Sequence, residues 1–156
     1  MNAIRQRRHA ARGSSRTGAA AVELAIVLLL LLTLIFGMIE LSMAVFRYNN
    51  VSAAARRIAR MAIVRGEMAP SALGNWGPTA VSGSGDSTDP VLAAIEPGLV
   101  VLEPADTTVS LAWPDGNSAV GSRVRVTITS SHDPFLTFPF TSGWSYSAVS
   151  ELEIAH

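Results

Sequence analysis

One carboxylate stands where a membrane-spanning sequence normally has none. Glu23 comes at the head of residues 24–39, sixteen residues without a charged side chain. A charged side chain at the centre of a bilayer costs roughly 2.5–3.5 kcal/mol on insertion scales, and a simple membrane anchor has little reason to carry that cost. Glu23 is therefore either a marker of the membrane boundary or a functional residue.

No side-chain pattern typical of catalysis or metal binding accompanies this carboxylate. His9, His132 and His156 are scattered, and no nucleophile elbow, phosphate-binding loop, HExxH or dinucleotide-binding fingerprint occurs. The chain has no cysteine, which excludes disulfides and thiolate metal sites. Asp86 and Asp89 lie in a Ser/Gly-rich segment that falls far short of a calcium-binding loop. We expect no catalytic residue, metal, cofactor or small-molecule substrate, so the protein is not predicted to be an enzyme.

The net charge of zero hides an uneven distribution of charge. Residues 1–18 carry five arginines and no acid, residues 19–65 carry five arginines and two acids, and residues 66–156 carry two arginines and ten acids. Such asymmetry is expected when parts of a chain face different environments.

Residues 19–45 are predicted to form a transmembrane helix, because about 20 apolar residues cross the hydrocarbon core of a bilayer. The basic, acid-free start favours a cytoplasmic N-terminus, although Arg47, Arg56, Arg57 and Arg60 follow closely behind the span. A secretory signal peptide is the rival interpretation, since residues 42–44 (SMA) resemble a cleavage site, but its apolar part normally runs only 7–15 residues.

The helix is predicted to continue past the membrane, to about residue 65. No proline occurs between Met1 and Ala69, and apolar residues recur at alternating steps of three and four, as on one side of a helix: Tyr48, Val51, Ala55, Ile58 and Ala62. Arg56, Arg57 and Arg60 fall on the opposite side. We expect that side to contact solvent or lipid headgroups, and we expect no nucleic-acid site.

The remainder of the chain is predicted to be a linker followed by a small sheet. Residues 66–90 hold twelve Gly, Pro or Ser residues, a composition typical of loops. Alternating apolar residues then predict strands over 107–113, 123–129 and 145–154, and residues 114–117 (PDGN) predict a turn between the first two. A sheet with one apolar face needs a cover, and the helix stripe is the natural candidate.

The predicted fold class is therefore α+β and pilin-like, a long N-terminal transmembrane and amphipathic helix followed by a small antiparallel sheet. The predicted divisions are a basic cytoplasmic leader (1–18), the transmembrane helix (19–45), its amphipathic continuation (46–65), a linker (66–98) and a β-rich exported domain (99–156).

Residues 16–65 resemble the TadE-like family, pseudopilins of bacterial tight-adherence (Flp-type) pilus systems. The resemblance rests on residues 18–27 (GAAAVELAIV), the apolar run, residues 36–41 (FGMIEL) and the helical segment that contains Asn49, Asn50 and residues 53–56 (AAAR). The family usually has an aromatic residue where Leu24 stands and often a proline where Leu29 stands.

The resemblance implies that a membrane prepilin peptidase cuts the chain after Gly18. Ala19 would then carry a free ammonium one helical turn before Glu23, which its own N-terminus or that of a neighbouring subunit could neutralise. Glu40, near the far end of the span, has either a pairing role or a boundary role. Thr33 and Gly37 have a small-x3-small spacing that admits a neighbouring helix.

The resemblance implies a minor pilin or pseudopilin in the bacterial inner membrane, with a cytoplasmic N-terminus and an exported C-terminal domain. Its expected partners are the membrane, the prepilin peptidase, other pilin-like subunits and the pilus assembly platform. The alternatives are an uncleaved single-pass subunit of an envelope or secretion complex, and an exported binding protein released by signal peptidase.

Overall fold

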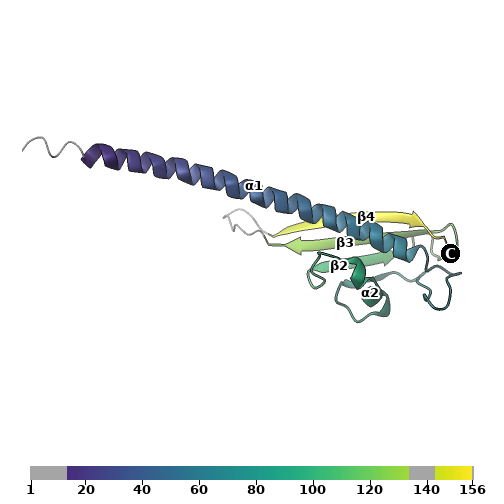
Figure 1. The fold of residues 1–156 in the computed structure, drawn as a ribbon. Helices are drawn as coiled ribbons and strands as arrows, with labels where there is room; N and C mark the ends of the chain where they lie inside the picture. Colours follow the sequence, from purple (N-terminus) through teal and green to yellow (C-terminus); the bar gives the residue numbers. More distant parts are fainter. Residues whose placement is uncertain (1–13, 134–142, 156) are drawn as a thin grey trace, which may run out of the picture. The chain divides into compact units, whose positions relative to one another are not determined.

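The computed structural model describes residues 14–133 and 143–155. The chain divides into two compact units, Met1–Leu41 and Ser42–His156. Helix α1 (Ser14–Ala62) supplies the described part of the first unit and continues into the second. The elements that follow α1 are, in order, β1 (Val81–Ser84), α2 (Pro90–Ile95), the 3-10 turn η1 (Glu96–Gly98), β2 (Thr107–Ala112), β3 (Arg123–His132) and β4 (Trp144–Glu153). Figure 1 labels α2, β2, β3 and β4 among them.

The long helix is confirmed, with slightly different ends from those predicted. It begins at Ser14, upstream of Gly18, and ends at Ala62. After it, the backbone N–H of Arg65 bonds to the carbonyl of Ala62, and the guanidinium of Arg65 lies 4.2 Å from the ring centre of Trp76. The helix therefore ends close to the predicted stop before Gly66.

The four strands form one antiparallel sheet in the order β1-β2-β3-β4. Pairs such as Val109↔Ile128 and Ile128↔Ala148 place apolar residues of neighbouring strands on the same face. The predicted β2–β3 turn is present, with Gly116 at a φ of 73°, a conformation that glycine adopts without strain. The prediction of an α+β chain with a small antiparallel sheet is confirmed.

The core of the second unit lies between the last part of α1 and one face of this sheet (Figure 1). The helix buries six residues: Val51, Ala54, Ala55, Ile58, Ala59 and Ala62. From β2 and β3 the buried apolar residues are Val109, Leu111, Val124, Val126 and Ile128. Four of the five predicted stripe residues are buried, but Tyr48 is exposed, because the helix face is covered by the core only from Val51 onward.

Residues 66–98, predicted as a linker, contain regular structure. Their Gly, Pro and Ser residues occupy specific positions in it: Pro90 begins α2, and the side chain of Asp89 accepts hydrogen bonds from the backbone N–H groups of Val91 and Leu92 at 2.9 and 3.3 Å. A Cβ on Gly83 of β1 would lie 2.7 Å from the Leu92 side chain. Part of this Gly/Pro/Ser-rich segment therefore forms β1, α2 and η1.

Candidate functional site

The first part of α1 is an apolar helix that no other described residue covers. Every large apolar side chain between Val22 and Leu41 is exposed. The helix contains a window with a mean hydropathy of 2.8, none of it buried, which makes it long and apolar enough to cross a membrane. At 1.5 Å per residue, residues 19–45 extend about 40 Å, more than the ~30 Å of a hydrocarbon core. This surface needs lipid or other apolar helices around it.

Gly18, Ala19 and Glu23 lie together on α1, within two helical turns. Ala19 and Glu23 are four residues apart, so their side chains lie on the same side of the helix. All three residues are exposed, and a Cβ built on Gly18 would meet nothing within 4 Å. Packing within the described chain therefore gives no reason for a glycine at position 18.

Gly37 and Glu40 lie further along the same helix, one turn apart. A Cβ on Gly37 would also meet nothing within 4 Å. The Thr33 hydroxyl donates a 2.7 Å hydrogen bond to the carbonyl of Leu29, so its polar group is already satisfied inside the helix. Glu40 is seventeen residues beyond Glu23, which places the two carboxylates about 25 Å apart along the helix axis. The predicted site residues therefore form two separate groups.

The arginines that follow the apolar run lie outside the core, as predicted. Arg56, Arg57 and Arg60 are exposed, and Arg57 donates a 3.2 Å hydrogen bond from its guanidinium to the carbonyl of Gly98. That bond joins α1 to η1 inside the second unit. The cationic side of the helix therefore has a structural role as well as contact with solvent.

Comparison with protein families gives a match for this helix. Residues 18–60 match the family model described as TadE-like protein. The chain carries a TadE-like segment. No curated protein and no solved structure matches the chain.

The TadE-like segment begins at Gly18 and contains Ala19, Glu23, Gly37 and Glu40. The match indicates a component associated with a tight-adherence pilus. The one uncovered apolar helix among residues 14–133 and 143–155 agrees with membrane anchoring and with contacts to pilin-like subunits. Because the match stops at residue 60, it covers the helix but none of the sheet.

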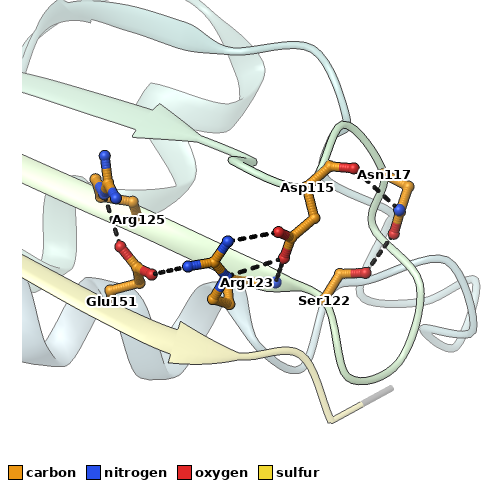
Figure 2. Close-up of polar contacts among 6 residues, drawn as sticks. All are labelled: Asp115, Asn117, Ser122, Arg123, Arg125 and Glu151. Carbon is orange, nitrogen blue, oxygen red and sulfur yellow. Dashed lines mark hydrogen bonds and ion pairs between the residues drawn. The ribbon is translucent and has the colours of Figure 1, made fainter.

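A second group of charged residues lies on the outer face of the sheet, at the β2–β3 turn (Figure 2). Arg123 contacts Asp115 at 2.6 Å and Glu151 at 3.1 Å, and Arg125 contacts Glu151 at 2.7 Å. Hydrogen bonds from the Arg123 side chain and backbone lower the pKa of Asp115, and the bond from Arg125 is the main cause that lowers the pKa of Glu151. In return, Asp115 raises the pKa of Arg123.

These ion pairs are exposed and therefore weak, so we assign them to holding the turn. Asn117 supports the same turn, donating to the Asp115 carbonyl and accepting from the hydroxyl of Ser122 (Figure 2). The strand predicted over residues 123–129 gave no information about the partners of Arg123 and Arg125. Among the described residues, no group of three or more His, Asp or Glu side chains is placed to hold a metal ion.

The second unit also contains a polar pocket of about 360 Å³ that sequence reasoning did not find. Its lining comes from three separate parts of the chain: Arg47 from α1, Glu103 and Asp106 from before β2, and Ser130, Ser131, His132 and Asp133 from the end of β3. No spacing within one segment signals such a site. The acidic residues before β2 gave no motif, and Arg47 was considered only for its effect on membrane orientation.

Proposed function

We propose that the protein is a minor pilin or pseudopilin of a tight-adherence pilus or a related secretion system, cleaved after Gly18 before it assembles. The observation that carries the proposal is the family match, which begins at Gly18 and runs along a helix whose apolar surface nothing else in the described chain covers. A subunit that leaves the membrane and enters a bundle of helices needs such a surface in both places.

Cleavage after Gly18 explains both the glycine and the carboxylate. Glycine offers no side chain to clash in a protease cleft, and the cut creates an ammonium on Ala19. A buried carboxylate is costly unless it is paired, and in a helical bundle Glu23 is paired by the ammonium of its own chain or of a neighbour. Pairing between subunits also fixes the axial register, because a slip of one turn separates the two charges.

The cleavage test compares two glycines of the same helix. We expect the chain, produced with a cognate prepilin peptidase, to have Ala19 as its mature N-terminal residue by mass spectrometry. Gly18→Leu should block the cut and Gly37→Leu should not, because both positions are open and neither substitution disturbs packing within the chain. A mature N-terminus elsewhere, or normal processing of Gly18→Leu, would refute this part of the proposal. Retention of residues 1–18 would instead indicate the uncleaved membrane subunit.

The assembly test concerns the charge on Glu23. Glu23→Gln keeps the shape of the side chain but leaves a partner ammonium without its counter-charge, so recovery with sheared or cross-linked pilus subunits should fall while the membrane level stays normal. Glu67→Gln, which removes an exposed carboxylate outside the helix, is the control and should assemble normally. If Glu23→Gln co-assembles as well as wild type, the carboxylate only marks the membrane boundary. Glu40→Gln in the same assay decides between pairing and boundary roles for Glu40.

The proposed location is the bacterial inner membrane, with residues 66–156 outside the cytoplasm. The basic residues before Gly18 support this orientation by the positive-inside rule. A reporter that is active only after export should therefore be active when fused after His156. An active cytoplasmic reporter at the same position would reverse the orientation.

A further inference from the structure

The polar pocket of the second unit has walls fixed by the start of β2 and the end of β3. Thr107 pairs with Ser130 in the sheet, and their hydroxyls are 3.3 Å apart. The Ser131 backbone N–H bonds to the carbonyl of Asp106 at 3.1 Å. The Thr107 hydroxyl also donates to the carbonyl of Glu103 at 2.7 Å. These bonds hold the acidic segment before β2 against β3, so the pocket is formed without a ligand.

The described charged side chains that line the pocket form no ion pairs with one another. Glu103, Asp106 and Asp133 present exposed carboxylates, while Arg47 is partly buried. Within the described part of the chain, the Nε atom of Arg47 is buried without a hydrogen-bond partner, and no ion pair joins Arg47 to the three acids. A guanidinium binds carboxylate or phosphate oxygens through charge-assisted hydrogen bonds, and Arg47 lines the pocket without an ion pair to the described acids. Arg47 therefore favours a ligand that brings an anionic oxygen into the pocket.

The same pocket disfavours a ligand that is only anionic, because three carboxylates face it. A ligand that carries both a phosphate and an ammonium satisfies both requirements. The phosphate accepts from Arg47, and a primary ammonium donates up to three hydrogen bonds to carboxylates such as those of Glu103 and Asp106. The pocket volume of about 360 Å³ lies at the small end of the range for ligand sites.

The position of Arg47 in the sequence identifies the source of such a ligand. Arg47 follows the apolar residues 19–45 by two positions on the same helix, about 3 Å along its axis. That is the level at which lipid headgroups surround a membrane-spanning helix. We propose that this pocket binds the headgroup of phosphatidylethanolamine, with its phosphate on Arg47 and its ammonium on Glu103 and Asp106. The inference rests on the proposed membrane anchoring.

The test measures lipid selectivity of the purified full chain in a neutral maltoside detergent. Short-chain phosphatidylethanolamine, phosphatidylglycerol and free phosphoethanolamine are titrated calorimetrically. We expect saturable binding of phosphatidylethanolamine that is about tenfold tighter than that of either other compound, the effect of roughly one charge-assisted hydrogen bond. Equal binding of phosphatidylglycerol would overturn the zwitterion assignment, and equal binding of free phosphoethanolamine would overturn the lipid assignment.

Variants test which residues bind the phosphate and which bind the ammonium of the headgroup. Arg47→Gln should weaken phosphatidylethanolamine binding about tenfold, whereas Arg60→Gln, an exposed arginine of the same helix that does not line the pocket, should leave it unchanged. The double variant Glu103→Gln/Asp106→Asn keeps the side-chain shapes and should abolish the preference for phosphatidylethanolamine over phosphatidylglycerol. Undiminished phosphatidylethanolamine binding by Arg47→Gln, or undiminished selectivity in the double carboxylate variant, would overturn the proposal.

Two controls keep these outcomes decisive. Thermal unfolding of Arg47→Gln should be close to that of wild type, because among the described residues the Nε atom of Arg47 has no hydrogen-bond partner and Arg47 forms no ion pair. If Arg47→Gln fails to fold, the carboxylate variant decides alone. Leader cleavage and pilus recovery are measured separately, so a chain that is cleaved and assembled but does not select phosphatidylethanolamine overturns this inference and leaves the proposed function intact.

Discussion

Truncation of Ile58 tests whether the helix stripe holds α1 on the sheet. Ile58 is fully buried, and a Cβ on the neighbouring Gly98 would lie only 2.9 Å from its Cγ1 atom. Ile58→Ala therefore removes side-chain atoms at a site bounded by the backbone of η1, which cannot easily collapse into the space. Substitutions of this type cost 2–5 kcal/mol, and the tight surroundings place this one at about 3–4 kcal/mol.

A loss of this size is a large fraction of the 5–15 kcal/mol that stabilises an ordinary domain. For a unit of this size it lowers the melting temperature by roughly 10 °C or more. Tryptophan fluorescence of the full chain in detergent measures the change, because Trp76 and Trp113 of the second unit are only 5% and 6% exposed.

The matched control is Ile39→Ala, the same truncation on the same helix at a residue that is 53% exposed in the first unit. It should leave the unfolding of the second unit unchanged. If Ile58→Ala melts within about 2 °C of wild type, or if both variants lose stability equally, the stripe does not hold the helix on the sheet.

Two further predictions concern the second unit. Because Arg123 lowers the pKa of Asp115 from its ordinary 3.8, the ion pair stabilises the folded state above that pH and its contribution is lost as the pH falls through the lowered value. Asp115→Asn should thus lower the melting temperature slightly at pH 7, and the difference should shrink as the pH falls below 3.8; a difference that stays constant down to low pH would contradict this. Val101 is 66% exposed and has a φ of 76°, a strained conformation for a β-branched residue. Val101→Gly should raise the melting temperature by a few degrees, whereas Val100→Gly should not. A lower melting temperature for Val101→Gly would show that backbone strain at this position does not determine the stability change.

Periodic patterns in the sequence predicted the elements whose side chains alternate between core and solvent. Val124, Val126 and Ile128 alternate with outward residues at a period of two, and burial on one face of a sheet requires that period. Val51 and Ile58 were found from the helical period in the same way. In each case one whole face of the helix or strand is buried, so apolar residues recur in the sequence with the period of that element.

The remaining features depend on contacts between distant residues, which no local pattern records. A glycine in this composition is typical of a loop, yet Gly83 lies in β1. Glycine fits there because the Leu92 side chain occupies the space that a Cβ would need. Arg123 and Glu151 are neighbours only after β3 pairs with β4. Arg47 and Asp106 share a pocket only after α1 packs against the sheet. Composition and periodicity carry no information on such pairs.

The two parts of α1 differ in what covers their apolar side chains. Between Val22 and Leu41 the helix is apolar all round, which demands an apolar environment on every side. From Val51 to Ala62 it has one apolar stripe, and the sheet of its own chain covers that stripe. Within the described chain, only the first part therefore still needs partners. In the proposed pilus, contacts between helices are therefore expected in residues 18–45, where Glu23, Gly37 and Glu40 lie.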